Sequence, residues 1–317
     1  MNKSQNKELM EKQGYRFIGK NKHSAVKICE WCRESLRGKR FCYKEQFYGK
    51  EDDIASHQCI QFTPVAFHCT HNCEFCWRIG EFEQVPKDFK WDKPKELVDE
   101  AIEAHKLLLQ GFKGAENQDI EKFQQAMKPK QFAISLTGEP TLYPYLPELI
   151  NEITSRGISA YIVSNGTNPE MIKQLAEKGQ PTKMYITLPA PDEETYTKIC
   201  HPAMKDSWKK ILESLSLLEK FKSSVIRLTL VKDMNITNPK AYADLIKQAN
   251  PDYVELKAFM SIGGARERLS IDSMPSHEQV KEFAQEIVQY LDNPVKQSTF
   301  KIVGENLPSR VVVLSGN

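Results

Sequence analysis

Residues 69–76 read CTHNCEFC and hold three cysteines at spacings of four and three residues: Cys69, Cys73 and Cys76. The preceding apolar run, residues 61–67, predicts a strand that leads directly into this cysteine loop. Thiolates are soft ligands that suit iron–sulfur clusters and zinc, and a cluster held by only three cysteines keeps one iron open to another ligand. A zinc site would need a fourth ligand, which His68 or His71 could supply. The loop therefore predicts a metal centre, with iron–sulfur and zinc both open at this point.

The distribution of cysteines agrees with a reducing compartment. Seven of the eight cysteines of this 317-residue chain lie between Cys29 and Cys76. No apolar run approaches the roughly 20 residues that span a bilayer, and the polar N-terminal stretch lacks the apolar segment of a signal peptide. We therefore expect a cytoplasmic protein without membrane contact, in which a cysteine cluster more often binds metal than forms disulfides.

The charge is unevenly distributed along the chain. The first 50 residues contain 13 Lys and Arg but only five Asp and Glu, a net charge of +8 that leaves −6 for the rest and +2 overall. Clustered cations release counterions when they neutralise phosphates, so a nucleic acid is one expected partner. A solvated basic face without a partner is the alternative. The composition, 40% hydrophobic and 27% charged, excludes collagen-like and mostly disordered proteins.

Beyond residue 60, short apolar runs alternate with longer amphipathic stretches, a pattern typical of βα units. We expect strands over residues 61–67, 132–136, 160–163, 183–188, 225–231 and 253–259, and two further strands over residues 300–303 and 311–314. We expect one helix to begin near residue 94 and another to lie around residue 195. Further helices are expected over residues 146–153, 208–221, 241–249 and 276–290. Six units predict an α/β fold, a partial (β/α)6 barrel of the TIM type, with its chemistry at the C-terminal strand ends.

The expected organisation has two parts. Residues 1–60 form a basic, cysteine-rich N-terminal module, and residues 61–317 form the partial barrel with a C-terminal extension. The polar connection over residues 114–130 is expected to be a mobile loop. The sequence contains no internal repeat that would point to a different architecture.

The cysteine loop resembles a known signature. The spacing C-x3-C-x2-C after the first strand of a βα barrel, with the aromatic Phe75 before the third cysteine, is similar to that of the radical S-adenosylmethionine superfamily. This resemblance implies a 4Fe-4S cluster held by Cys69, Cys73 and Cys76. It also implies reductive cleavage of S-adenosylmethionine to a 5′-deoxyadenosyl radical, a reaction in which the cofactor carries the chemistry and the protein orients it.

Two further strand ends match the superfamily, and a third, at Thr187, departs from it because Pro189 stands where an acidic or amide residue is expected. Gly138 and Glu139 correspond to the motif that contacts the methionine amino group, where glycine allows a close approach. Ser164 and Asn165 end the third strand and correspond to a ribose contact, and Thr187 ends the next one. The resemblance therefore implies that these five residues bind S-adenosylmethionine.

Longer segments narrow the resemblance. The relevant motifs are CWR at 76–78, LTGEPTLYP at 136–144, VSNGT at 163–167, RLTLV at 227–231, ELK at 255–257, GGAR at 263–266 and MPSH at 274–277. In their order and spacing they resemble the archaeal type of the 4-demethylwyosine synthase family of tRNA wybutosine biosynthesis. The resemblance implies a carbon–carbon lyase that converts N1-methylguanosine at position 37 of tRNA-Phe to 4-demethylwyosine, with pyruvate as the two-carbon donor.

The upstream cysteines have two interpretations. Cys29 and Cys32 form a C-x2-C pair that, with Cys42 and Cys59, could make a zinc site of four thiolates. The family resemblance instead implies that Cys29, Cys42 and Cys59 hold a second 4Fe-4S cluster, whose open iron binds pyruvate. Cys32 is then supernumerary.

Two residues outside these sets are of interest. Lys44 follows Cys42 by two positions and is the candidate either to stabilise the charge of pyruvate or to form a Schiff base with its keto group. A solvated lysine in a basic region is the alternative interpretation. Cys200 stands far from the other cysteines and is expected to be a small buried hydrophobic residue.

The resemblance gives the basic module a purpose, because a tRNA anticodon loop would place its phosphates there. Proteins that bind RNA loops combine cations, which contact phosphates, with aromatic rings, which stack on bases. Such side chains are interspersed here at Trp31, Arg33, Arg37, Lys39, Arg40, Phe47, Tyr48 and Trp77. Arg266 and Arg268 are expected to contact a phosphate at the barrel mouth. The chain length leaves no room for a fused flavodoxin-like domain, so we expect a separate ferredoxin- or flavodoxin-like electron donor, and a monomer.

Two rival functions remain open from the sequence. One is a different radical enzyme that modifies RNA or a peptide. The other is a non-catalytic RNA-binding module that holds zinc. Iron and sulfide content distinguishes the second rival from an enzyme with two clusters.

Overall fold

The computed structural model describes residues 3–78, 82–114, 119–291 and 300–316. The chain divides into two compact units. The first unit consists of residues 1–69, 83–163 and 177–182. The second unit consists of residues 70–82, 164–176 and 183–317. No helix among the described residues is long and apolar enough to cross a membrane.

Five strands form the sheet of the first unit. They are β1 (Arg16–Ile18), β2 (Ser24–Lys27), β3 (Cys59–Thr63), β4 (Gln131–Ile134) and β5 (Ser159–Ser164). β1, β2 and β3 pair antiparallel in that order, whereas β3, β4 and β5 pair parallel. The N-terminal segment therefore extends the sheet from the side of β3, and a boundary near residue 60 does not coincide with the limits of either unit.

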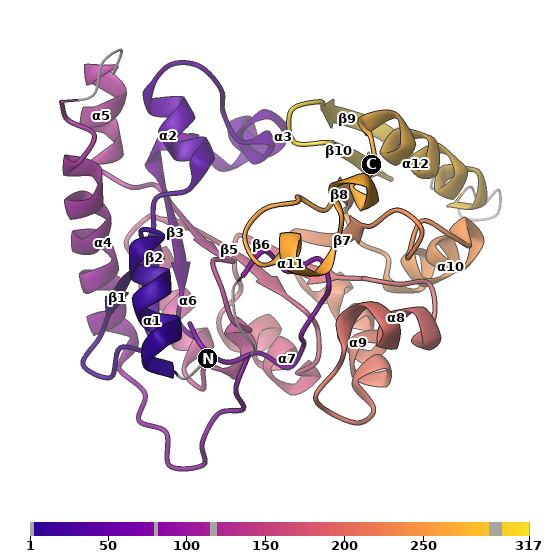
Figure 1. Ribbon diagram of the computed structural model, residues 1–317, viewed down its shortest axis with the longest axis horizontal. Helices are drawn as coiled ribbons and strands as arrows, with labels where there is room; N and C mark the ends of the chain where they lie inside the picture. The colour runs from indigo at the N-terminus through magenta and orange to yellow at the C-terminus, as the bar shows by residue number, and fades with distance from the viewer. Residues whose placement is uncertain (1–2, 79–81, 115–118, 292–299, 317) are drawn as a thin grey trace. The chain divides into compact units, whose positions relative to one another are not determined.

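Helices flank this sheet, and Cys29 and Cys42 directly precede two of them. They are α1 (Lys3–Lys12), α2 (Glu30–Leu36), α3 (Tyr43–Asp52), η1 (Ser56–Gln58), α4 (Pro94–Gln110), α5 (Ile120–Ala126), η2 (Pro140–Leu142) and α6 (Leu146–Ser155). α4 packs against β1, β2, β3 and α6. Figure 1 shows α5 beyond the upper end of α4, beside α2.

The second unit has three parallel strands and an antiparallel edge. β6 (Lys183–Thr187), β7 (Ser224–Leu230) and β8 (Tyr253–Ala258) are parallel, and β10 (Val311–Ser315) pairs antiparallel with β8 and with β9 (Lys301–Asn306). Its helices are α7 (Pro169–Lys178), α8 (Glu193–Cys200), α9 (Ser207–Ser216), η3 (Leu218–Lys220), α10 (Pro239–Ala249), α11 (Ala265–Arg268), η4 (Ile271–Ser273) and α12 (His277–Leu291). α10 and α12 pack side by side (Figure 1). The rings of Tyr242 and Phe283 meet edge to face between these helices.

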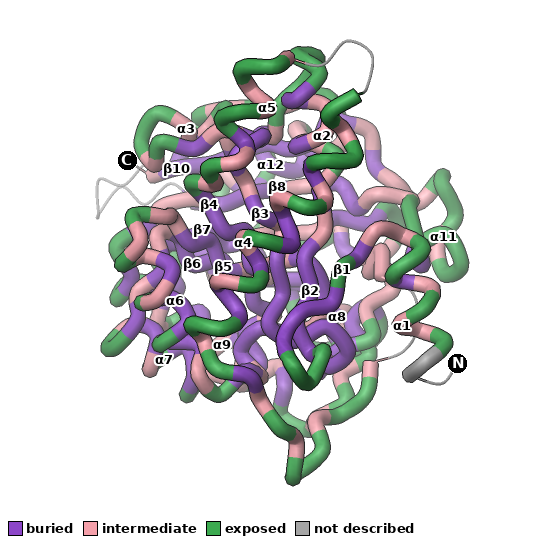
Figure 2. Tube along the Cα trace, turned by 90° about the vertical axis from the view of Figure 1, so that its left-hand side faces the viewer, coloured by how far each residue is buried: buried purple, intermediate pink, exposed green. Residues whose placement is uncertain are grey.

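The predicted alternation of strands and helices is confirmed because burial follows the pattern of the sequence. Leu97, Ala101 and Ala104 lie on the buried face of α4, which begins at Pro94, a residue suited to a first helical turn. The strands β2, β3 and β4 are buried along most of their length (Figure 2). The expected loop over 114–130 is wrong in part, because α5 occupies Ile120–Ala126 with Asp119 as its N-cap, while residues 115–118 lie outside the described residues.

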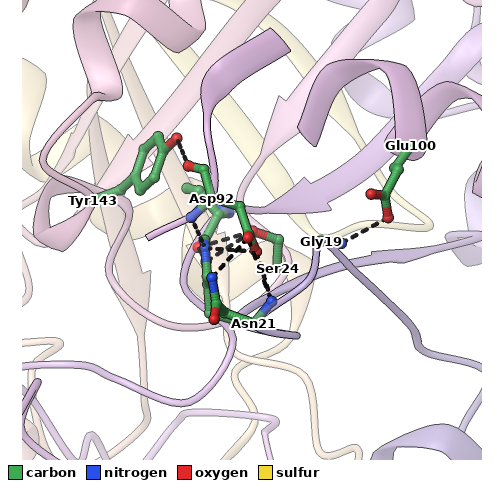
Figure 3. Close-up of polar contacts among 8 residues, drawn as sticks. Gly19, Asn21, Ser24, Asp92, Glu100 and Tyr143 are labelled. Atoms are coloured by element: carbon green, nitrogen blue, oxygen red, sulfur yellow. Dashed lines mark hydrogen bonds and ion pairs between the residues drawn. The ribbon is translucent and has the colours of Figure 1, made fainter. Parts of the chain in front are cut away.

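A partly buried polar network fixes the β1–β2 hairpin (Figure 3). The backbone N–H of Asp92 donates to His23 Nε2 at 2.9 Å, and the Asp92 carboxylate accepts from Asn21 Nδ2 at 2.8 Å. The Tyr143 hydroxyl donates to the carbonyl of Asp92 at 2.7 Å, and His23 Nδ1 lies 2.7 Å from the carbonyl of Pro64. Because Pro64 directly follows β3, the network holds the segment that leads to the cysteine loop.

Buried His105 on α4 makes a pH dependence of stability testable. Neither of its ring nitrogens has a hydrogen-bond partner among the described residues, and burial lowers the pKa of His105 to about 4 from an ordinary value of 6.5. His105 therefore binds a proton more tightly in the unfolded chain than in the folded chain. The contribution of the neutral, buried His105 to the free energy of unfolding is complete above pH 6.5 and is lost as the pH falls towards 4. We expect His105→Leu to remove about 3 kcal/mol of acid destabilisation at pH 4. Urea unfolding of both proteins at pH 7 and pH 4 measures this, and an equal loss of stability in both would contradict it.

Candidate functional site

Three of the upstream cysteines lie at the ends of secondary-structure elements in the first unit. Cys29 is the N-cap of α2, Cys42 is the N-cap of α3, and Cys59 is the first residue of β3. The backbone N–H of Cys32 donates to Cys29 Sγ at 3.3 Å, and Ser56 Oγ accepts from the backbone N–H of Cys42 at 2.7 Å. Thiolates at the starts of helices are favoured by the free N–H groups and the helix dipole, which suits ligands of an iron–sulfur cluster.

Neighbouring thiols affect the pKa values of Cys29 and Cys59. Burial, followed by the neighbouring Cys42, raises the pKa of Cys29 to about 11. Burial raises the pKa of Cys59 as well, and Cys29 and Cys42 add to this effect while Lys44 opposes it. The three sulfurs therefore lie near one another with a lysine beside them. A metal that binds here must displace their protons.

The contacts of the Cys32 side chain are not those of a metal ligand. Its side chain is fully buried, and its thiol donates to the carbonyl of His57 at 3.7 Å. It packs in an apolar cluster with Ile28, Leu36 and Leu109. In a tetrahedral zinc site the sulfur atoms would lie about 3.8 Å from one another. Within the described ranges, no three of the four upstream cysteines have sulfur atoms that all lie within 4.8 Å of one another. The arrangement fits a wider cluster with three cysteines better than a four-thiolate zinc site.

Lys44 lies in α3, next to this cysteine set. It is 9% exposed, and its Nζ lies 5.0 Å from the centroid of the Tyr161 ring in β5. Its charge lowers the pKa of Cys59, so the ammonium group lies close to that sulfur. Lys44 is therefore not a solvated surface lysine. Its position allows it to meet a small molecule bound at the three thiols.

The second cysteine loop is divided between the two units. Cys69 ends a segment of the first unit, whereas Cys73 and Cys76 belong to the second, and all three are partly exposed. In the second unit the loop is anchored by backbone hydrogen bonds to the end of α8. Asn72 N–H donates to the carbonyl of Cys200 at 3.0 Å, and Glu74 N–H donates to the carbonyl of Ile199 at 2.9 Å.

Cys200 is buried, as predicted, but its thiol has a specific neighbour. The ligand atoms of His71, Cys73 and Cys200 all lie within 4.8 Å of one another. The hydrogen bond with Cys200, together with burial, raises the pKa of Cys73. His71 Nε2 lies 2.6 Å from the Tyr196 hydroxyl, and burial lowers the pKa of His71 to about 3, so its ring is neutral. No local spacing points to this pair of thiols, because 127 positions separate them.

A loop after β8 holds the other side of the cysteine loop. Gly263 adopts φ +54°, and a Cβ at this position would lie 2.0 Å from the carbonyl oxygen of Trp77, so only glycine allows this approach. Gly264 N–H donates to the same oxygen at 2.9 Å. The Arg268 guanidinium donates to the carbonyl of Glu74 at 3.2 Å and to the carbonyl of Cys76. Arg268, expected to contact a phosphate, thus supports the cysteine loop.

We expect Arg268→Ala to loosen the cysteine loop and to accelerate iron loss. Two hydrogen bonds to loop carbonyls disappear, each worth about 1 kcal/mol, so a chelator should remove iron severalfold faster from the loaded protein. Arg266→Ala is the matched control, because Arg266 donates to the carbonyl of Ser261 within its own loop. Equal rates of iron loss in the two variants would contradict this role of Arg268.

The candidate S-adenosylmethionine residues of the first unit lie against residues 65–68, the segment between β3 and Cys69. Gly138 adopts φ +69°, and a Cβ there would lie 1.6 Å from the carbonyl oxygen of Val65. Glu139 N–H donates to the carbonyl of His68 at 2.9 Å. The Glu139 carboxylate accepts from Thr141 Oγ1 at 2.7 Å and caps η2. The motif is therefore packed directly on residues 65–68.

The other candidates lie in the second unit. Ser164 Oγ accepts from Gly166 N–H at 3.0 Å and closes the turn after β5. Asn165 Nδ2 donates to Thr70 Oγ1 at 2.8 Å, which places Asn165 beside the start of the cysteine loop. Thr187 ends β6 and is partly exposed. The structure thus brings Asn165 to the cysteine loop of its own unit.

Comparisons with known proteins agree with these observations. The model of the radical SAM superfamily matches residues 115–257, and the model for wyosine base formation matches residues 248–316. The S-adenosyl-L-methionine-dependent tRNA 4-demethylwyosine synthase of Pyrococcus abyssi is 44% identical over 96% of this chain and 87% of that protein. The enzyme of the same name from Methanocaldococcus jannaschii is 37% identical over 97% of this chain and 94% of that protein.

The chain belongs to the S-adenosyl-L-methionine-dependent tRNA 4-demethylwyosine synthase family. A structure of TYW1 with a lysine–pyruvate adduct bound is 34% identical, with a TM-score of 0.84 over 100% of this chain and 96% of that chain. A crystal structure of archaeal TYW1 is 31% identical, with a TM-score of 0.79 over 100% of this chain and 97% of that chain. The predicted family and the α/β radical SAM fold with its partial barrel are confirmed. Membership of the superfamily implies S-adenosylmethionine and a 4Fe-4S cluster.

Proposed function

We propose that this protein converts N1-methylguanosine at position 37 of tRNA-Phe to 4-demethylwyosine, as a carbon–carbon lyase that takes two carbons from pyruvate. One observation carries the proposal. Lys44 is buried beside Cys59, in a family with a structure that contains a lysine–pyruvate adduct. A buried lysine amine is the nucleophile that a covalently held keto acid requires.

Two cysteine sets would hold two 4Fe-4S clusters. Cys69, Cys73 and Cys76 would hold the cluster that binds S-adenosylmethionine, which supplies a 5′-deoxyadenosyl radical able to remove a hydrogen atom from the N1-methyl group. Gly138, Glu139, Ser164, Asn165 and Thr187 would bind and orient S-adenosylmethionine. The packing of the glycine motif on residues 65–68 supports this, because it joins the motif to the segment that carries the first cysteine.

The upstream set would hold the second cluster. Cys29, Cys42 and Cys59 are the proposed ligands, and Cys32 is not one of them. The supporting observations are that Cys29 and Cys42 raise the pKa of Cys59 and that Cys42 raises the pKa of Cys29. Cys29 and Cys59 also raise the pKa of Cys32, so the observation against Cys32 is the hydrogen bond of its thiol to the carbonyl of His57. This assignment gives pyruvate a place next to Lys44.

Lys44 would act as the nucleophile towards the keto carbon of pyruvate. The Nζ atom must be neutral to attack, so the ammonium first gives up a proton. In the complete step, the ammonium and the ketone form a protonated imine and one water molecule, with a single positive charge before and after. The burial of Lys44 excludes bulk water from the adduct.

The remaining partners follow from the surface and from the chemistry. Arg37, Lys39 and Arg40 are exposed in the connection between α2 and α3, where they can contact the phosphates of an anticodon loop. The electrons would come from a ferredoxin- or flavodoxin-like protein. We propose that the enzyme works as a monomer in the cytoplasm.

The test is product analysis with the anaerobically reconstituted enzyme. Enzyme, reductant, S-adenosylmethionine, carbon-labelled pyruvate and tRNA-Phe that contains N1-methylguanosine should yield labelled 4-demethylwyosine in the digested RNA. Formation of 5′-deoxyadenosine without this product would point to another radical enzyme. Purified protein that contains zinc and lacks iron would point to a zinc-binding RNA module.

A further inference from the structure

The ring of Tyr161 forms one wall of the space around Lys44. Tyr161 lies within β5 and is fully buried, and the Lys44 Nζ lies 5.0 Å from the centroid of its ring. The Tyr161 hydroxyl donates to a carboxylate oxygen of Asp52, at the far end of α3. The ring therefore faces the amine while its hydroxyl is held elsewhere.

The spacing along α3 fixes this arrangement. Lys44, Tyr48 and Asp52 are four residues apart, so they lie on one face of the helix. The Lys44 amine lies over the Tyr161 ring, Asp52 binds its hydroxyl, and the Tyr48 ring meets it edge to face at 6.4 Å. Three successive turns of α3 thus contact one tyrosine of β5, which fixes the orientation of its ring.

We propose that Tyr161 is a positioning residue for the covalent step at Lys44, and that its ring stabilises the protonated imine formed with the keto group of pyruvate. This inference rests on the proposed function. In that step the Lys44 ammonium and the ketone become an iminium and water, so the positive charge stays beside the ring throughout. The ring acts through Lys44 and orients it towards the three cysteines.

The ring favours the iminium over the ammonium because the two cations differ in hydration. An ammonium is compact and strongly hydrated, and it loses tightly bound water at a buried position. An iminium spreads its charge over carbon and nitrogen and has a flat face that can lie on an aromatic ring. Loss of the ring should weaken the adduct by about fivefold.

The test measures the adduct itself and does not depend on turnover. The reconstituted holoenzyme is incubated with increasing pyruvate and reduced with borohydride, and the modified Lys44 peptide is quantified by mass spectrometry. We expect Tyr161→Phe to bind pyruvate within about twofold of wild type and Tyr161→Met to bind about fivefold more weakly. Phenylalanine with one, two or three ring fluorines at position 161 should weaken the adduct stepwise, because fluorine reduces the charge on the ring face while the shape changes little.

The fluorinated series keeps the inference testable if Tyr161→Met does not fold. Tyr253→Met is the matched control, because the Tyr253 ring lies 5.3 Å from the Nζ of another lysine, Lys183, in the second unit. This substitution should leave the adduct unchanged. Unchanged pyruvate binding throughout the series, with Lys44 still modified, would overturn the role of Tyr161 alone. Absence of any Lys44 adduct in wild type would overturn the proposed role of Lys44 and this inference with it.

Discussion

Lys44→Arg is expected to abolish the pyruvate adduct and to reduce formation of 4-demethylwyosine by about 10³-fold or more, the scale of loss when a covalent nucleophile is removed. Arginine keeps the positive charge and can still lie over the Tyr161 ring. Its guanidinium stays protonated at any working pH, so it has no free amine to attack a ketone. The measurements are borohydride trapping of pyruvate and nucleoside analysis of the tRNA. Cleavage of S-adenosylmethionine to 5′-deoxyadenosine should continue.

Lys50→Arg is the matched control for this substitution. Lys50 is an exposed residue in the last turn of the same helix, α3, so the change of side chain is identical but the environment is solvent. Its adduct and its product should match wild type. If Lys44→Arg formed product at the wild-type rate, the lysine would serve only as a charge, and the covalent role would be refuted.

Cys29→Ala is expected to halve the iron content of the reconstituted protein, from about eight atoms to about four. The remaining cluster should still cleave S-adenosylmethionine, while 4-demethylwyosine should fall below detection because the proposed second cluster, which would bind pyruvate, is absent. Cys59→Ala should behave in the same way, since its thiol adjoins both Cys29 and Lys44. Iron and sulfide analysis and electron paramagnetic resonance of the reduced proteins provide the measurements.

Cys32→Ala is the control, three residues from Cys29. Its thiol contacts the carbonyl of His57 and an apolar cluster, so its loss should cost about 1 kcal/mol of stability and no iron. A protein with four irons after Cys32→Ala and eight after Cys29→Ala would reverse the assignment. A decrease in both would indicate that the two thiols share one metal.

The fold of the barrel could be predicted from the sequence because its strands are buried and its helices are amphipathic. β7 and α10, for example, lie within one or two residues of the expected ranges. The N-terminal strands β1 and β2 were not predicted, since three and four residues are too short for a periodic pattern. α5 was missed for a related reason, because its seven mostly polar residues resemble a loop.

Site residues could be predicted where residues that act together lie a few positions apart in the sequence. The cysteine loop and the glycine motif are such cases. Contacts made by distant segments left no pattern to read. From the sequence, Tyr161 is an ordinary strand residue, and only the structure places Lys44 over its ring. Arg268 is likewise a surface cation in the sequence, and only the structure shows its hydrogen bonds to the carbonyls of Cys76 and Glu74.

β3 links the two sets of cysteines along one continuous segment. Cys59 begins the strand, and Cys69 follows its last residue by six positions. At about 3.3 Å per residue, the strand itself spans about 13 Å and cannot stretch. Inserting one residue would lengthen it and turn Cys59 to the opposite face of the sheet. A change in the length of β3 would therefore displace Cys59 relative to the segment that carries Cys69.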